Sequence, residues 1–363
     1  RSPLLNGRQA FDARAWATAY AQLTAADRVE PLAAEDLERG AMAAYLAGHD
    51  EDSEKLWTRA YQQLLADDQV ERAVRCAFWQ AMVLFDRGQA GPGSGWIARA
   101  RRLLDDRQLD CVERGYLLLP SALERIMAGD FEAGASIFEQ AASIGDRFGD
   151  SDLRALARHG RGRALTRVGR IHEGAMLFDE AMVAVTANEV SPIAAGIVYC
   201  GVIEGCSEIF DLKRAQEWTA ALGRWCDEQP DLIPYRGACL VRRSEMLQVR
   251  GVWSDALTEA TRACERLLRG ANRMRVALAF YEVAELHRLR GEFAKAEEAY
   301  LAARERGKNP EPGRALLRLA EGQLDAAVAA IRRALEEVRD RKVRARVLIG
   351  AVDVFIAAND VKA

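Results

Sequence analysis

The sequence predicts an all-α fold in which paired helices stack one after another into a solenoid. Two observations predict it. First, alanine and leucine are abundant, charges recur at helical spacing, and runs with the alternation typical of β-strands are nearly absent from the 363 residues. Second, a short pattern of residues recurs along the chain at an almost constant interval. About half of the residues are hydrophobic, which is enough to bury the interior of a stacked array.

The recurring pattern begins at a predicted turn. In one unit Gly129 stands at the turn, and Gly134, Phe138 and Ala141 follow five, nine and twelve residues later. Glycine ends a helix in a left-handed conformation that other residues resist. Small residues at five and twelve allow two antiparallel helices to approach closely, and the larger residue between them fills the gap. The turns predicted in this way lie near positions 7, 48, 88, 129, 169, 210, 251, 291, 322 and 359.

The interval between turns indicates the type of repeat. It is 40 or 41 residues from Gly7 to Gly291 and then shortens, because Pro310 and Pro312 trim the first helix of the next pair. The unit at Phe210 lacks the glycine but keeps the rest of the pattern. We therefore expect a right-handed superhelical solenoid of tetratricopeptide-like helix pairs, with a period of about 40 residues, as a single array over residues 1–363. An irregular helical bundle is the alternative.

Both ends of the sequence resemble interrupted repeats. Gly7, with Trp16 and Ala19, matches the second half of a pair, and residues 359–361 resemble a turn without its partner helix. A solenoid needs a polar capping element at its end. We therefore expect the natural protein to continue beyond this sequence, above all at the carboxyl end.

Ligand-binding residues are expected on the first helix of each pair, which lines the concave face of a tetratricopeptide array. Six residues before the turns stand Met42, Met82, Leu123, Arg163, Glu204, Glu245, Glu285 and Leu316. The predicted groove is therefore apolar in its first half and polar to acidic in its second, which is typical of a site for a small molecule or peptide. The candidate residues are His159, Arg163, Tyr199, Cys200, Glu204, Val241, Glu245, Tyr281, Glu285 and Arg288. Alternatively, the glutamates pair with arginines of neighbouring helices and only solvate the surface.

Composition and motifs argue against several other classes of protein. The net charge of −3 makes the chain a poor candidate for gripping nucleic acid, and no apolar run approaches the roughly 20 residues of a membrane span. The seven cysteines form no Cys-x-x-Cys pair, and the glycine-rich residues 91–95 lack the Gly-Lys-Ser/Thr of a phosphate loop. No catalytic group of residues is recognisable. We expect a cytoplasmic protein that is not an enzyme and needs no cofactor or metal.

Several longer segments are distinctive enough for a comparison with a family. They are residues 73–79 (AVRCAFW), 110–117 (DCVERGYL), 189–193 (EVSPI), 196–200 (GIVYC), 224–226 (RWC) and 229–237 (QPDLIPYRG). These segments resemble the helical-repeat region of actinobacterial LuxR-type transcriptional regulators. In that family a repeat array precedes a short carboxyl-terminal helix-turn-helix domain that binds promoter DNA. That domain and the nucleotide-binding domain of the larger relatives have no counterpart in this sequence.

Two hypotheses about function follow. The resemblance implies the ligand-sensing or oligomerisation region of a LuxR-type regulator, which contacts promoter DNA only through a carboxyl-terminal domain absent from this sequence. The alternative is a tetratricopeptide adaptor that captures a peptide or protein partner. In either case we expect a small-molecule or peptide ligand in the groove and no membrane partner; a second copy of the chain is left open as a partner.

Overall fold

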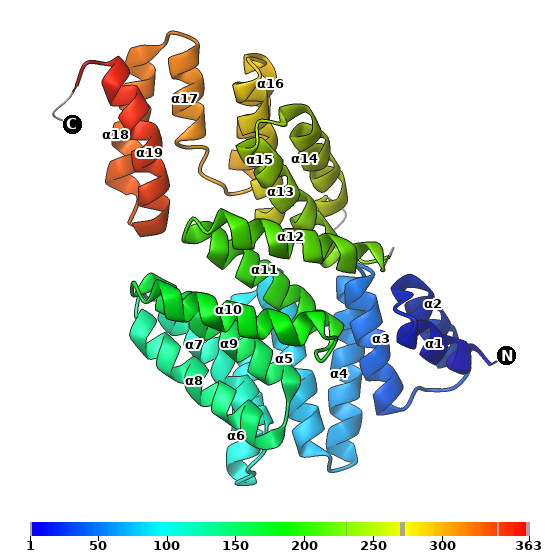
Figure 1. The fold of residues 1–363 in the computed structure, drawn as a ribbon. Coiled ribbons are helices and arrows are strands. Elements are labelled where there is room, and N and C mark those ends of the chain that lie inside the picture. Colours follow the sequence, from blue (N-terminus) through cyan, green and yellow to red (C-terminus); the bar gives the residue numbers. More distant parts are fainter. Residues whose placement is uncertain (1, 230, 269–272, 340, 361–363) are drawn as a thin grey trace. The chain divides into compact units, whose positions relative to one another are not determined.

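The computed structural model describes residues 2–229, 231–268, 273–339 and 341–360, with the backbone alone described at 236, 238, 341 and 342. Every regular element in this described part is an α-helix, and the helices are numbered α1 to α19 (Figure 1). Residues 1–239 form one compact unit and residues 240–363 a second, so the boundary falls within α13.

The first unit contains twelve helices and the start of α13. From α1 to α12, successive helices pack on one another. The helices are α1 (Pro3–Asp12), α2 (Trp16–Asp27), α3 (Ala34–Leu46), α4 (Asp50–Ala66), α5 (Val70–Asp86), α6 (Ala90–Asp106), α7 (Glu113–Met127), α8 (Phe131–Phe148), α9 (Ser151–Arg167), α10 (Ile171–Thr186), α11 (Pro192–Glu208) and α12 (Leu212–Asp227).

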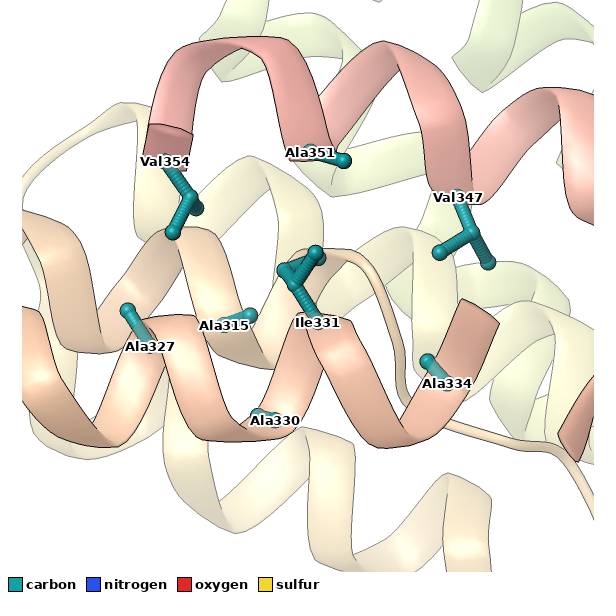
Figure 2. Close-up of a cluster of buried hydrophobic side chains, with 8 residues drawn as sticks. All are labelled: Ala315, Ala327, Ala330, Ile331, Ala334, Val347, Ala351 and Val354. Atoms are coloured by element: carbon teal, nitrogen blue, oxygen red, sulfur yellow. The ribbon is translucent and has the colours of Figure 1, made fainter. Parts of the chain in front are cut away.

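The second unit repeats the same arrangement over a shorter stretch. Its helices are the remainder of α13 (Pro234–Val249), α14 (Trp253–Leu267), α15 (Arg273–Leu289), α16 (Phe293–Glu305), α17 (Gly313–Ala320), α18 (Leu324–Glu337) and α19 (Arg341–Ala357). The last three enclose a core of small aliphatic side chains: Ile331 of α18 points toward α19, where Val347 and Val354 meet it (Figure 2). The predicted shortening of the helix after Pro312 is confirmed, because α17 spans only eight residues.

The turn that ends each first helix has one repeated geometry. At Gly48 the backbone is left-handed, with a φ of 82°. The Gly48 N–H donates to the Tyr45 carbonyl, and the His49 N–H donates to the Ala44 carbonyl five residues back. This pair of hydrogen bonds is the Schellman arrangement, which satisfies carbonyls that the end of a helix otherwise leaves unpaired. The turn therefore sets where the second helix of each pair begins.

The residues after each turn bury the contact between the paired helices. Gly174, Phe178 and Ala181 are all buried in α10. A side-chain carbon at Gly174 would lie 2.6 Å from the carbonyl oxygen of Gly162, so the backbones of α9 and α10 touch at this point. Phe178 fills the space beside this contact, and full burial of such a ring stabilises the fold by about 1.5–3 kcal/mol. The pattern of small, large and small residues thus specifies the spacing of the pair.

The turn predicted at Gly7 is wrong. Gly7 lies inside α1, where a side-chain carbon would come within 2.8 Å of Leu23 Cγ. The turn is instead at Arg14, whose φ is 57°, and the buried Ala19, Leu23 and Ala26 follow it at five, nine and twelve residues. The first interval is therefore 34 residues, from Arg14 to Gly48.

The other predicted turns are confirmed, including two without glycine. Phe210 adopts a φ of 58° and Asn359 a φ of 54°. Val361, the last residue of the turn predicted at 359–361, lies outside the described residues. Within the described part of the chain, no helix is both long enough and apolar enough to cross a membrane.

The turn geometry predicts opposite effects for two glycine substitutions. Gly129→Ala should lower the free energy of unfolding by about 1–2 kcal/mol, because alanine resists a φ of 83°. Gly223→Ala should raise it by up to about 1 kcal/mol, because Gly223 lies within α12 and an added methyl meets nothing within 4 Å. Urea denaturation of both variants measures the difference. Equal shifts of the two midpoints would show that the left-handed turn does not constrain the fold.

Candidate functional site

The positions six residues before each turn are accessible in both units. We call them the first-helix row. In the first unit the row consists of Met42, Met82, Leu123, Arg163 and Glu204, and in the second unit it consists of Glu245, Glu285 and Leu316; each is half-buried or exposed. Their neighbours along the same helices are largely buried, because the opposite face of each first helix packs on its partners. The row therefore presents side chains that can meet a ligand.

Ion pairs join neighbouring row residues in the first unit. Arg163 Nη1 of α9 lies 3.2 Å from Glu204 Oε2 of α11. Its Nη2 atom donates to Glu208 Oε1 at 2.8 Å, and Arg167 Nε donates to the other oxygen of Glu208 at 3.1 Å. Glu208 is nearly enclosed, since its side chain is 7% exposed. This network ties two first helices together, which is the pairing that the alternative interpretation of the row predicts.

The other candidates of the first unit differ in how far they reach the surface. His159 packs against α11 at Gly201, and burial, assisted by the charge of Arg163, lowers the pKa of the imidazole to about 4. The ring is therefore neutral at pH 7. Tyr199 is only 3% exposed and its ring centroid lies 5.6 Å from that of Trp225, so it belongs to the core. Cys200 is half-buried.

In the second unit three glutamates and two arginines form what we call the acidic cluster: Glu245, Glu282, Glu285, Arg242 and Arg288. Arg242 Nη1 lies 2.6 Å and 3.0 Å from the two carboxylate oxygens of Glu245, one turn away on α13. Arg288 Nη2 donates to Glu285 Oε2 at 2.7 Å on α15. Each of these two glutamates is thus neutralised within its own helix.

Glu282 is the unusual member of the acidic cluster. Its residue is 6% exposed and its Oε1 accepts a hydrogen bond of 3.0 Å from Ser244 Oγ of α13. Burial raises the pKa of Glu282 to about 8, and the negative charges of Glu245 and Glu285 act in the same direction. The hydrogen bond from Ser244 and the charge of Arg242 oppose this rise. With a pKa of about 8, the carboxyl group is mostly protonated at pH 7. Loss of this proton would add one negative charge to the cluster.

Tyr281 and Glu285 pack against the helices that follow α15. The hydroxyl of Tyr300 in α16 donates to Glu285 Oε1, and the rings of Tyr281 and Tyr300 lie 5.7 Å apart. Lys308 Nζ lies 4.7 Å from the centre of the Tyr281 ring. At Gly313 a side-chain carbon would come within 2.5 Å of the Tyr300 hydroxyl, so this close packing requires glycine. Val241 is 6% exposed and belongs to a core cluster with Ala263 and Ala279.

The structure thus brings together three of the predicted residues, Glu245, Glu285 and Arg288, with Tyr281 beside them. Glu282, Ser244, Tyr300 and Lys308, which also lie here, are not among the residues predicted from the sequence. Glu282 and Ser244 lie off the first-helix row, and their meeting depends on how α13 packs on α15. Among the described residues no group of three or more histidine, cysteine or acidic side chains is placed to hold a metal ion.

The raised pKa of Glu282 predicts a pH-dependent stability. The folded state binds this proton more tightly than the unfolded chain, whose glutamate titrates near 4.5, so stability should fall as the pH rises from about 4.5 to 8. Glu282→Gln, which keeps an acceptor for Ser244, should unfold at higher urea than wild type at pH 8.5, by at least about 1 kcal/mol, and match it at pH 5. Glu298→Gln, on the exposed face of α16, is the control. Parallel curves for Glu282→Gln and wild type at all pH values would contradict the assignment.

Neither a known protein-family model nor a curated protein matches the sequence. Solved structures match the fold. The Rap protein complexed with competence and sporulation factor has a TM-score of 0.61 at 13% identity, over 91% of this chain and 93% of that one. NprR in complex with its cognate peptide NprX has a TM-score of 0.56 at 14% identity, over 80% and 86%. The apo form of the quorum sensor NprR from B. thuringiensis has a TM-score of 0.52 at 15% identity, over 79% and 82%. The chain therefore has the all-α fold of tetratricopeptide-like helical-repeat proteins.

Proposed function

We propose that this chain is the ligand-binding repeat region of a regulator, and that residues 240–363 bind a peptide carrying a basic group at the acidic cluster. The observation that carries the proposal is the buried Glu282, which accepts a hydrogen bond from Ser244 and whose pKa is raised by burial and by the charges of Glu245 and Glu285. Strongly perturbed pKa values concentrate at functional sites.

The charges of the acidic cluster favour a cationic guest. With Glu282 protonated, Glu245 and Glu285 are balanced by Arg242 and Arg288. A guest ammonium or guanidinium group beside Glu245, whose side chain is 30% exposed, favours loss of the proton from Glu282. The new negative charge then attracts the guest. A guest anion gains nothing comparable, because it opposes that ionisation.

A surface that is merely solvated accounts for only part of this arrangement. The pairs Arg242–Glu245 and Arg288–Glu285 are the i, i+3 pairs of an ordinary polar helix face. Solvation of such a face does not explain a third carboxyl group that is almost fully buried, because burying a carboxyl group is unfavourable. We attribute the presence of a carboxyl group at this buried position to ligand binding.

A peptide suits the row better than a compact small molecule. Row residues of the second unit come from three successive first helices, α13, α15 and α17, and such rows suit extended guests. The proteins of similar fold include NprR in complex with its cognate peptide and Rap complexed with competence and sporulation factor. Their likeness to this chain lies in the fold, and it makes a peptide the first class of ligand to test.

The wider setting that we propose is a LuxR-type transcriptional regulator, on the strength of the family-like segments, including residues 229–237. Ligand binding to the array would then alter the presentation of a carboxyl-terminal helix-turn-helix domain to promoter DNA. The second candidate is a peptide-binding adaptor without such a domain. Reading the downstream coding sequence separates the two: a stop codon within a few dozen residues leaves no room for a helix-turn-helix and rules out the regulator.

The proposed site predicts that basic peptides bind and that their binding releases protons from the protein. An array of short peptides should select members containing lysine or arginine, and Glu245→Ala or Tyr281→Ala should abolish the stabilisation that a selected peptide gives to the wild-type protein. Glu298→Ala, on the exposed face of α16, should leave it unchanged. Calorimetry at pH 7 in buffers of different ionisation enthalpy should show net proton release, which Glu282→Gln removes.

Two results would place the site elsewhere. One is selection of acidic peptides. The other is an undiminished peptide-induced rise of the melting temperature in both Glu245→Ala and Tyr281→Ala.

A further inference from the structure

A basic pocket of about 570 Å³ lies within residues 240–363, and none of the five residues of the acidic cluster lines it. It is lined by the carboxyl-terminal end of α16, the loop that joins α16 to α17, the exposed side of α17, and α18. Five cationic side chains line it, those of Arg304, Lys308, Arg314, Arg318 and Arg333. The acidic side chains in its wall are those of Glu311 and Glu337. A pocket of this size accommodates a compound of several hundred daltons.

Three of the arginines have no carboxylate partner in the described part of the chain. Arg314 is paired, since its Nε lies 2.9 Å and 3.0 Å from the oxygens of Glu297. For Arg304, Arg318 and Arg333 no carboxylate oxygen of the described residues lies within ion-pair distance. Elsewhere in the protein most arginines form ion pairs with nearby glutamates or aspartates, as Arg163 and Arg288 do. The guanidinium groups of the pocket therefore keep donors free for a guest.

One carboxyl group of the protein, that of Glu311, lies in the wall of the pocket. Glu311 Oε2 accepts the Ala315 N–H at 2.8 Å, within the first turn of α17. Burial raises the pKa of Glu311, while the N–H of Ala315 and the charges of Arg318, Arg314 and Arg333 act to lower it. The arginines are thus close enough to act on a carboxylate in the pocket.

The α18 side of the pocket includes two alanine side chains, which leave space for a ligand. Ala330 and Ala334 of α18 line the pocket, and both are almost fully enclosed. Both also belong to the core cluster of α17, α18 and α19, in which Ile331 points toward α19 (Figure 2). Larger residues at these positions would fill the space between α18 and the loop before α17. Burial, together with the charge of Arg346, lowers the pKa of Lys308, and the charge of Glu285 opposes this.

We propose that this pocket binds a small polyanion, a molecule bearing two or more phosphate or carboxylate groups, through Arg304, Arg318 and Arg333. Guanidinium groups suit this chemistry because each donates two parallel N–H bonds to one oxyanion. The three arginines are not members of the acidic cluster, and the guest that they select has the opposite charge to the peptide proposed there, although Lys308 of the pocket wall contacts Tyr281.

The test uses tripolyphosphate and citrate as probes, titrated calorimetrically at a fixed ionic strength of about 0.15 M. At least one should bind with a stoichiometry of one. Arg318→Gln combined with Arg333→Gln should weaken that binding by at least about tenfold, since two charge-assisted hydrogen-bonding groups are lost. Arg102→Gln combined with Arg125→Gln removes two exposed arginines of the first unit and should leave the affinity within about twofold of wild type.

The two probes and the variants distinguish the outcomes. Preference for tripolyphosphate identifies a phosphorylated ligand, and preference for citrate a polycarboxylate. The melting temperature of the Arg318→Gln, Arg333→Gln protein without ligand should match that of wild type, and Glu245→Gln should bind the probe normally. The proposal is overturned if neither probe binds at 10 mM, or if both double variants lose affinity equally. Binding of a single-stranded oligonucleotide at these arginines, with no binding of either probe, would also overturn it.

Discussion

The fold rests on the close approach of two helices at the positions five and twelve residues after the left-handed turn that ends the first helix of each pair. Where α9 meets α10, the backbones touch through Gly162 and Gly174, and Phe178 closes the remaining space. The turn fixes the phase of this contact, because its two hydrogen bonds end one helix and determine where the next begins. A helix pair built in this way buries one face of each first helix and leaves the row six residues before the turn accessible. Position relative to the turn therefore decides which side chains pack and which can meet a partner.

The two units use the accessible row differently. Around Arg163 and Glu204 the charges are joined between helices, and Glu208 completes the network, so this part of the surface is internally balanced. In the second unit each glutamate of the row is half-buried and paired within its own helix, and the third carboxyl group, that of Glu282, is buried. The pocket formed by the end of α16, the loop before α17, α17 and α18 instead carries an excess of cationic side chains, and three of its arginines lack carboxylate partners among the described residues. Residues 240–363 thus carry a charge-balanced cluster with a buried third carboxyl group and a basic pocket, and this part of the chain is where we place ligand recognition.

Much of this could be predicted from the sequence, because the repeat depends on local geometry. The turns at Gly48 through Gly322 follow from glycine and its spacing, and the turn at Phe210 followed from Ala215 and Leu222 without any glycine. The same reasoning fails at Gly7, because a glycine in a helix interior was taken for a turn; Ala19, Leu23 and Ala26 carry the pattern that identifies Arg14 instead. The burial of Glu282 was not predictable, since it depends on Ser244 of another helix. The basic pocket lies where the period is broken, at the loop before α17, and a repeat pattern says nothing about such a loop.

The account is tested most directly by a carbon-13 NMR titration of the glutamate side chains, with the Glu282 carboxyl signal assigned by its absence from the Glu282→Gln protein. This signal reports the packing of α13 on α15, which encloses the carboxyl group. It also reports the protonation of Glu282, on which the proposed ligand binding depends. A titration midpoint near pH 8 is the predicted result. A midpoint near 4.5, the value of a solvated glutamate, would show that Glu282 is open to water and that neither the packing nor the proposed site is as described.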